Sequence, residues 1–341
     1  MQNKKVLLIT EANDFVASGH LFECAELAKL LRKAGIHVDI AVNDDANDSF
    51  KQRLDGPYLE YHKNVEIDHV FFVNQLQSER YSILVTNLRE VHDEWISWIR
   101  KVCNAVIICI DEWGHRFLGC DVIINPMIDP YFWEYKGSKA KLYTGQAYLI
   151  LPEKIAEYHK REKNISKKIT RVCVSMGGVD KYGSTVKIVK WILGQHQEVQ
   201  LDVILGGGFK YQENLDSIIK GNSNINMMQN IKNIYDYFEK ADLAFCAGGN
   251  TLHELACIGT PAIVVPTMPH EFNNGKKFEE WGFGIVLSQA DNISNDEFTK
   301  AWNLISEENK RRDMMLAGKK ICTGTGGELI MNLIMRCLSE K

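Results

Sequence analysis

Short, uninterrupted apolar runs alternate with amphipathic stretches along the whole chain. In the first part, these runs predict strands at residues 5–10, 37–42, 70–73, 83–86, 105–110 and 121–125. Apolar residues recur at three- and four-residue intervals in 20–33 and 90–102, which predicts helices there. Strands that are apolar throughout are covered on both faces, so we expect a parallel sheet flanked by helices.

A polar, charged segment around residues 146–169 interrupts this alternation. A second series follows it, with strands expected at residues 170–175, 201–205, 225–228, 243–246, 262–265 and 284–287. We therefore predict an α/β protein of two doubly wound domains, residues 1–151 and 168–325, that face each other across a central cleft. The final segment, 326–341, is predicted to be a helix that packs back on the first domain.

Composition excludes several classes of protein. The chain has 341 residues, of which 40 are Lys or Arg and 44 are Asp or Glu, so its net charge is −4. Without a basic run it lacks the electrostatic footprint of a nucleic-acid-binding protein. Its nine cysteines form no C-x-x-C pair, and no His, Asp or Glu grouping has metal-ligand spacing. We expect neither metal nor cofactor, no membrane span, and a cytoplasmic location, at most peripheral to the inner membrane.

Strand-to-helix turns are the candidate sites, because open parallel sheets bind ligands beyond the carboxyl ends of their strands. The first such turn leads into the first helix through Gly19 and His20. A helix N-terminus disfavours the charged imidazole, so His20 is expected to be neutral and able to accept a proton as a general base. The alternative is a polar residue that only starts the helix.

The second candidate turn is Ser175-Met176-Gly177-Gly178-Val179-Asp180, directly after a predicted strand. Two glycines before a helix can expose backbone N–H groups that bind a phosphate. The turn matches neither the dinucleotide-binding pattern nor the P-loop pattern. The alternative is an ordinary tight connection.

The third candidate is CAGGNTLHELACIGTPAIVVP, at residues 246–266. A strand ends at its glycines, and Asn250 or Thr251 can start the next helix while the amides there meet an anion. Glu254, one turn further, can reach the two hydroxyls of a ribose, and it needs solvent or a partner because an unpaired buried carboxylate is costly. A plain strand–helix–strand unit with a polar first turn is the alternative. Three more polar residues are expected at the same sheet edge, namely His270, Asn273 and Asn274.

The segment AGGNTLHELACIGTPAIVVP, followed by HEFNN, resembles the nucleotide-binding half of the GT-B-fold sugar enzymes. Two groups are similar: the N-acetylglucosaminyltransferase that forms lipid II, and the UDP-sugar hydrolase of the pseudaminic-acid pathway with its spore-coat-polysaccharide relatives. The resemblance to the hydrolase is the longer one. It includes the GH turn at 19–20, ILVTN, IDEWGHRFLGCDVIINP, SMGGVD and TGTGGELI.

The resemblance implies a GT-B fold, no cofactor and a role for each matching residue. His20 matches the general base, which acts toward water in the hydrolase and toward an acceptor hydroxyl in the transferase. The substrate-binding positions that it implies are Gly19, Gly177 and Gly178, then Gly249, Asn250 and Thr251 for the diphosphate, Glu254 for the ribose, and His270, Asn273 and Asn274 toward the sugar. The helix starts after Gly178 and Gly249 are expected to stabilise the departing diphosphate.

Two positions depart from the hydrolase pattern. The hydrolases carry an Arg three positions after the histidine, where this chain has Glu23, and a D-x-Tyr-like unit where it has Asn87-Leu88-Arg89. We predict a UDP-sugar enzyme of bacterial surface-glycan biosynthesis that releases UDP by inverting attack at the anomeric carbon, with water as the favoured nucleophile. The alternatives are an inverting glycosyltransferase with a carbohydrate or lipid-linked acceptor, an epimerase of similar fold, and a nucleotide-sugar-binding protein without turnover.

Overall fold

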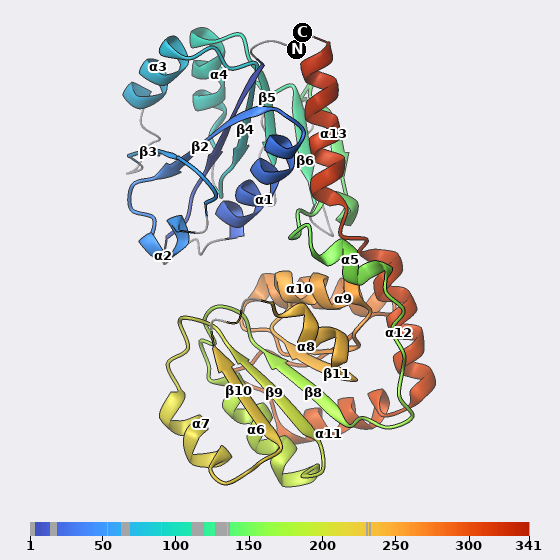
Figure 1. Cartoon of the computed structure of the whole chain (residues 1–341). Coiled ribbons are helices and arrows are strands. Elements are labelled where there is room, and N and C mark those ends of the chain that lie inside the picture. The colour runs from blue at the N-terminus through green and yellow to red at the C-terminus, as the bar shows by residue number, and fades with distance from the viewer. Residues whose placement is uncertain are drawn as a thin grey trace. The chain divides into compact units, whose positions relative to one another are not determined.

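The structure is a computed structural model. It describes residues 4–13, 19–52, 54–62, 69–89, 91–110, 119–126, 135, 137–229, 231 and 233–340. The chain divides into two compact units, one of residues 1–153 with 324–341 and one of residues 154–323 (Figure 1). We call them unit 1 and unit 2 and describe each by itself.

Unit 1 holds a parallel sheet of seven described strands in the order β3-β2-β1-β4-β5-β6-β7. The strands are β1 (Lys5–Thr10), β2 (His37–Asn43), β3 (Leu59–Tyr61), β4 (Ile83–Asn87), β5 (Val106–Ile110), β6 (Val122–Asn125) and β7 (Lys141–Thr144). The helices are α1 (Gly19–Lys33), α2 (Asp48–Lys51), α3 (His69–Ser78), α4 (Asp93–Val102), the 3-10 turn η2 (Gln146–Tyr148) and α13 (Gly326–Ser339).

The strand expected at residues 70–73 is wrong, because this segment belongs to helix α3. A four-residue apolar run fits a buried strand or one side of a helix equally well. Here Phe72 and Leu76, four positions apart, both enter the core beside Trp95. That spacing places them on one face of a helix.

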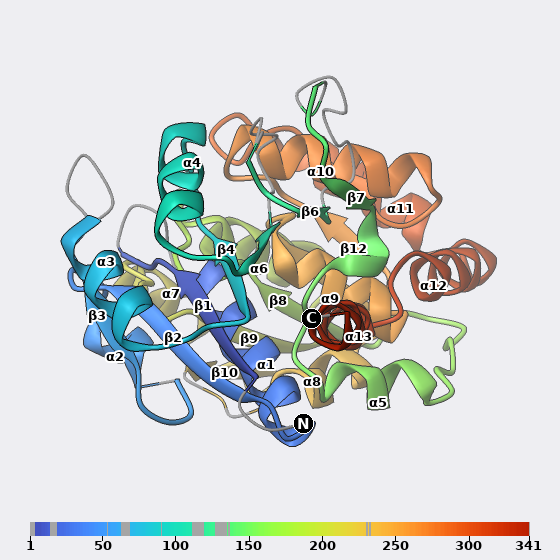
Figure 2. The same cartoon turned by 90° about the horizontal axis from the view of Figure 1, so that it is seen from above.

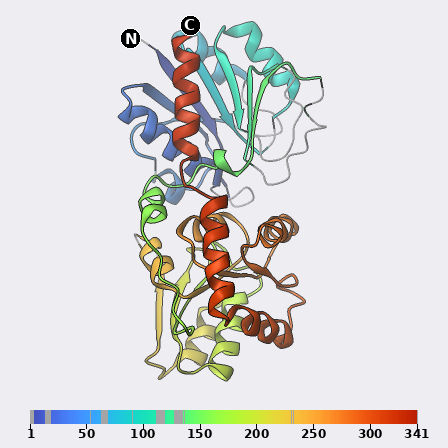
Figure 3. The ribbon, with the colours of Figure 1, turned by 90° about the vertical axis from the view of Figure 1, so that its right-hand side faces the viewer.

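Two apolar layers cover the sheet of unit 1. Alternate residues of β1 point to opposite faces, so Leu8 packs with α1 and α13 while Ile9 packs with α3 and α4. Helix α13 comes from the far end of the chain and packs beside α1 (Figures 2 and 3). A Cβ on Gly326 would lie 2.0 Å from the carbonyl oxygen of Leu149, so the glycines of the TGTGG segment permit close packing here.

Unit 2 repeats this architecture with six described parallel strands in the order β10-β9-β8-β11-β12-β13. The strands are β8 (Arg171–Ser175), β9 (Gln200–Leu205), β10 (Ile225–Gln229), β11 (Leu243–Cys246), β12 (Ala262–Val264) and β13 (Ile285–Val286). The helices are α5 (Ile155–Lys160), α6 (Ser184–Gln195), α7 (Gln212–Ile219), α8 (Tyr235–Lys240), α9 (Asn250–Ile258), α10 (Pro269–Glu280), α11 (Asn295–Ile305) and α12 (Glu308–Ile321). The prediction of two doubly wound α/β domains is confirmed.

Strand order reverses once in each sheet, between β1 and β4 in unit 1 and between β8 and β11 in unit 2. In doubly wound sheets this point leaves a crevice at the carboxyl ends of the strands, where ligands bind. Register places Thr10 opposite Asn87 in unit 1, and Ser175 opposite Cys246 in unit 2. The three candidate turns therefore follow strands at these two points.

Candidate functional site

The first glycine turn of unit 2, after β8, packs backbone to backbone against the turn after β9. The amide of Gly208 donates to the carbonyl oxygen of Gly178 at 3.0 Å, and a Cβ on Gly206 would lie 2.3 Å from the carbonyl oxygens of both Gly177 and Gly178. The C=O and N–H of a trans peptide point in opposite directions. The amides of Gly178 and Val179 therefore face away from the β9 turn.

Sequence reasoning missed Gly206 and Gly208 as supports of this turn. The signal was present as LGGGF, three consecutive glycines directly after an apolar run. What the pattern did not show is that the neighbouring turn fills the space beside Gly206.

One part of the expectation for this turn is wrong, because the start of the helix after Gly178 is already occupied. Helix α6 begins at Ser184, and the buried carboxylate of Asp180 accepts from the amides of Ser184 (2.8 Å) and Thr185 (2.7 Å). A carboxylate that satisfies these amides and faces the positive end of the helix leaves no place there for a phosphate. Any anion binding at this turn must use the glycine amides.

The start of helix α9, after β11, is open by contrast. Gly248 has a φ of +105°, and Gly249 occupies the N-cap position. No described side chain makes a hydrogen bond to the first-turn amides, although Oε1 of Glu271 lies 3.6 Å from a Cβ position built on Gly249. The first-turn amides of Asn250 and Thr251 thus belong to a helix end that can accept an anion.

Helix α10 holds the Gly248 turn from the other side. The side-chain amide of Asn274 donates to the carbonyl oxygen of Gly248 at 2.6 Å and lies 3.2 Å from Nε2 of His253. Asn274 was predicted to face the sugar, and its NH₂ group instead supports the turn. The two other polar residues predicted on this helix, His270 and Asn273, are exposed in its first turns.

Glu254 lies on α9, one turn after its open end. Its Oε1 accepts a hydrogen bond of 3.0 Å from the hydroxyl of Tyr235, the first residue of α8. Burial raises the pKa of Glu254 to about 7, and the hydrogen bond from Tyr235 acts in the opposite direction. The carboxyl group therefore titrates in the neutral range, where its capacity to accept two hydroxyl groups depends on pH.

His253, the neighbour of Glu254, is buried and structural. Its ring meets that of Phe278 edge to face, with centroids 4.9 Å apart, and its Nδ1 has no hydrogen-bond partner in the described part of the chain. Burial lowers the pKa of His253 to about 3, so the ring is neutral at physiological pH.

In unit 1, His20 is the second residue of α1 and is 8% exposed. Its Nδ1 lies 2.8 Å from Oδ1 of Asn87, the last residue of β4. Asn87 in turn donates from Nδ2 to Oε2 of Glu23 at 2.7 Å. The structure thus brings together His20 and the two positions that depart from the hydrolase pattern. Gly19 opens the helix, with no heavy atom within 4 Å of a Cβ built there.

Other candidate chemistry near His20 is limited. Cys24, one turn along α1, is fully buried, and burial raises the pKa of its thiol to about 12, so it is not a nucleophile at neutral pH. Residues 14–18, before Gly19, and residues 111–118 of the IDEWGHRFLGCDVIINP motif lie outside the described residues. Within the described ranges no group of three or more His, Cys, Asp or Glu side chains could hold a metal ion. None of the described helices has both the length and the apolar composition to cross a bilayer.

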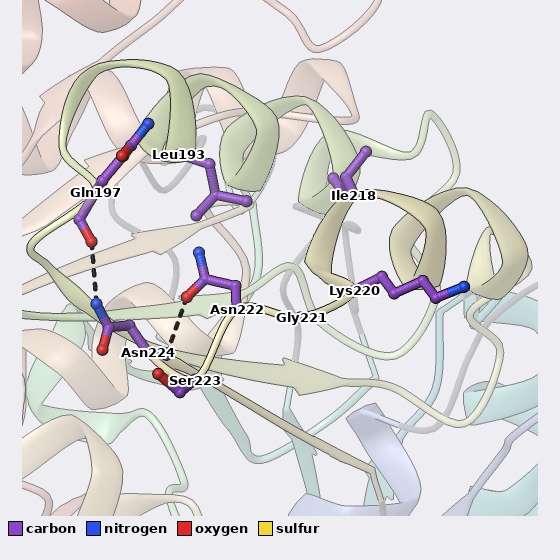
Figure 4. Close-up of a pocket in the computed structure, with 8 residues that line it drawn as sticks. All are labelled: Leu193, Gln197, Ile218, Lys220, Gly221, Asn222, Ser223 and Asn224. Atoms are coloured by element: carbon purple, nitrogen blue, oxygen red, sulfur yellow. Dashed lines mark hydrogen bonds between the residues drawn. The ribbon is translucent and has the colours of Figure 1, made fainter.

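An open, polar hollow in unit 2 lies at the edge of the sheet opposite to the glycine turns (Figure 4). Asn222 and Asn224 line it just before β10 begins, together with Gln197 after the end of α6. It therefore lies at the amino ends of the strands, whereas the glycine turns lie at the carboxyl ends. We assign it no role.

Comparison with known proteins finds similar sequences and similar folds. Residues 171–320, within unit 2, match the sequence profile of the Glycosyltransferase family 28 C-terminal domain. The spore coat polysaccharide biosynthesis protein SpsG of Bacillus subtilis is 20% identical over 317 residues, which are 90% of this chain and 91% of that protein. The uncharacterized protein MJ1062 of Methanocaldococcus jannaschii is 22% identical over 275 residues, 76% of this chain and 55% of its own, so the chain spans about half the length of that relative.

A transferase is also similar. The UDP-N-acetylglucosamine–N-acetylmuramyl-(pentapeptide) pyrophosphoryl-undecaprenol N-acetylglucosamine transferase of Oenococcus oeni is 24% identical over 200 residues, 55% of this chain and 53% of that enzyme. Among solved structures, MurG of Acinetobacter baumannii has a TM-score of 0.69 at 13% identity and covers 98% of this chain and 100% of its own. MnaA of S. aureus with UDP has a TM-score of 0.67 at 14% identity, covering 99% and 97%. Residues 171–320 are therefore similar to the Glycosyltransferase family 28 C-terminal domain, and the chain shares the GT-B fold of these solved structures.

Proposed function

We propose that the chain is a glycosyltransferase of surface-glycan biosynthesis that takes a sugar from a UDP-linked donor. The observation that carries this proposal is helix α9, whose N-terminus is uncapped by any described side chain and which presents Glu254 one turn later. An open helix end suits a diphosphate, and a carboxylate one helical turn further along suits the hydroxyls of a ribose. The family 28 match covers this helix.

On the donor side, we assign the diphosphate to the amides of Gly249, Asn250 and Thr251 and the ribose to Glu254. The turn at Gly177 and Gly178 adds amides that face away from its β9 neighbour. His270 and Asn273, both exposed, are assigned to the sugar, together with the remaining acceptor of Asn274. Gly19 is assigned to the same substrate. These groups supply neutral dipoles and one carboxylate, and they require no metal to meet the diphosphate.

The proposed reaction is a single inverting displacement. A hydroxyl oxygen of the acceptor bonds to the anomeric carbon while the bond from that carbon to the phosphate oxygen breaks. The electron pair leaves with UDP, and the hydroxyl proton passes to His20, which acts as general base. Water was the favoured nucleophile on the hydrolase resemblance. The transferase activity for which the Oenococcus oeni relative is named favours an acceptor hydroxyl instead.

The acceptor is a carbohydrate or a lipid-linked sugar. Two relatives, a spore coat polysaccharide biosynthesis protein and a pyrophosphoryl-undecaprenol N-acetylglucosamine transferase, support these two kinds of acceptor. We place the enzyme in the cytoplasm, peripheral to the inner membrane when the acceptor is lipid-linked.

UDP release separates the remaining possibilities. The full chain is incubated with UDP-N-acetylglucosamine and other UDP-sugars, with and without oligosaccharide or undecaprenyl-linked acceptors. Release that depends on an acceptor supports the transferase, whereas equal release without one means hydrolysis. Isomerised sugar with no UDP released would mean an epimerase. Saturable UDP-sugar binding with no turnover in any mixture would reduce the protein to a binding module and refute the proposal.

A further inference from the structure

Three polar side chains form a buried hydrogen-bonded chain that ends at the imidazole of His20. Glu23 accepts from Asn87, and Asn87 in turn meets His20, with donor–acceptor distances of 2.7 and 2.8 Å. Asn87 is fully buried and Glu23 is 4% exposed. Glu23 follows His20 by one turn of α1, whereas Asn87 reaches both from the end of β4, more than 60 residues away along the chain. Buried polar groups at such distances are held in one arrangement by their mutual hydrogen bonds.

Glu23 sets the direction of this chain. Asn87 turns its NH₂ group toward Glu23, where a carboxylate oxygen accepts the hydrogen bond. The carbonyl oxygen of the same amide then faces His20. Because a carbonyl oxygen also only accepts, Nδ1 of His20 must carry the hydrogen. In a neutral imidazole this leaves the lone pair on Nε2.

We infer that Glu23 and Asn87 are positioning residues that hold His20 in the tautomer with its hydrogen on Nδ1, so that Nε2 is the base. This inference rests on the proposed function. As the acceptor oxygen bonds to the anomeric carbon, its proton moves to Nε2, and the ring becomes an imidazolium with a hydrogen on each nitrogen. The bond from Nδ1–H to Asn87 persists throughout, and neither Asn87 nor Glu23 gains or loses a proton. Glu23, a departure from the hydrolase pattern, thus belongs to the base machinery of this chain.

The first test reads the tautomer directly. In the ¹⁵N-labelled full chain, ring-nitrogen NMR signals that vanish in His20→Ala are assigned to His20. The expected result is a protonated Nδ1 and an unprotonated Nε2. A wild-type His20 with its hydrogen on Nε2 would overturn the inference without any measurement of activity.

The second test removes the fixed direction of the hydrogen bonds while it keeps the shape of the side chain at position 23. Glu23→Gln gives Asn87 a partner that can donate or accept, so the Asn87 amide can turn over and the Nε2–H tautomer should appear. With an active donor and acceptor pair, kcat should fall about tenfold, as is typical when a partner that orients a functional histidine is lost, with the donor KM little changed. Glu26→Gln is the matched control, because Glu26 lies one turn further along α1, where it pairs with Lys29 and not with Asn87. An unchanged His20 tautomer in Glu23→Gln would refute the role of Glu23.

A double variant separates positioning from structural support. When Glu23→Gln is combined with Asn87→Asp, the carboxylate introduced on β4 can only accept, so it again forces the hydrogen onto Nδ1, while the side-chain amide introduced on α1 donates to it. The Nδ1–H tautomer and most of the lost kcat should return. A merely structural role predicts no rescue, since the double change moves both residues further from the wild type. Failure of the double variant to exceed Glu23→Gln in both readouts would contradict the inference.

These outcomes are distinct from failure of the proposed function. If the tautomer responds as expected but His20→Ala retains full turnover, the positioning stands and the base assignment falls. If His20→Ala abolishes turnover while Glu23→Gln changes neither tautomer nor kcat, the function stands and this inference falls.

Discussion

The hydroxyl of Tyr235 donates a 3.0 Å hydrogen bond to Oε1 of Glu254, across the contact between helices α8 and α9. This bond favours the ionised carboxyl group, whereas burial disfavours it more strongly, and the net result is a pKa of about 7 for Glu254. A carboxylate assigned to a ribose therefore changes charge within the physiological range.

Binding of UDP-N-acetylglucosamine should strengthen as pH rises through 7. If only the ionised Glu254 accepts both ribose hydroxyls, affinity should increase about tenfold between pH 6 and pH 8, as the ionised fraction does for a pKa near 7. Isothermal titration calorimetry measures this affinity at each pH. The ligand is the sugar nucleotide and not UDP, because the terminal phosphate of UDP has its own pKa near 6 and would titrate in the same range. Glu254→Gln should bind more weakly and with a flat pH profile, and a variant that keeps the wild-type slope would count against the ribose assignment.

Tyr235→Phe should move this pH profile upward. Removing the hydroxyl takes away an interaction that lowers the pKa of Glu254, so ionisation should require a higher pH. The same calorimetric titration, repeated across pH 6 to 9, locates the midpoint. A midpoint that stays in place or moves down would show that the Tyr235 bond does not govern the carboxyl group.

His20→Ala should remove turnover and leave donor binding intact. Loss of a general base typically costs about 10²–10⁴-fold in rate, whereas the donor contacts assigned to unit 2 do not involve this side chain. UDP release and UDP-sugar affinity are measured on the same preparation. The control is His37→Ala, because His37 is an exposed histidine of the same unit at the start of β2. Near-normal turnover in His20→Ala would refute the base assignment.

Gly206→Ala should disturb the turn at Gly177 and Gly178. The added methyl group would lie 2.3 Å from two backbone carbonyl oxygens, so the turns must separate, at a cost of about 1–3 kcal/mol in the free energy of unfolding, typical of overpacking. Affinity for the donor should fall as well, because the turn at Gly177 and Gly178 is displaced. Gly194→Ala is the control, because nothing lies within 4 Å of its Cβ position in helix α6, and Ala there should stabilise the helix by about 0.5–1 kcal/mol. Denaturant titration of both variants measures this, and equal stability of the two would contradict the packing argument.

Unit 2 should lose stability in mild acid through His253. The imidazole has an ordinary pKa of 6.5 when unfolded and a pKa of about 3 in the buried site, so the folded state binds the proton more weakly. Its contribution is complete above pH 6.5 and is lost as pH falls toward 3, at up to about 1.4 kcal/mol per pH unit. His253→Phe keeps a flat ring beside Phe278 and removes the proton site. Unfolding free energies at pH 7.5 and 5 should therefore differ less in the variant, and parallel pH dependence would exclude His253 as the cause.

Local sequence pattern determined the strands and the turns that follow them. The apolar runs at 5–10 and 83–86 are β1 and β4, and the segments with Gly177 and Gly249 follow strands as expected, since a short apolar run and the glycines after it are neighbours in the chain. The strand prediction at residues 70–73 was wrong, because an apolar run of only four residues fits a strand or a helix equally well.

Only the tertiary structure decided which polar groups are hydrogen-bonded within the protein and which are available to a ligand. Asp180 lies four residues before the first residue of α6, Ser184. Its two hydrogen bonds to the amides of this helix are seen only in the folded structure. The pairing of Asn87 with Glu23 joins residues 64 positions apart, because β4 lies beside β1 and ends at the same edge of the sheet. Periodicity reports the neighbours of a residue along its own helix or strand. Partners on other elements depend on strand order and register, and these are set by the packing of the whole sheet.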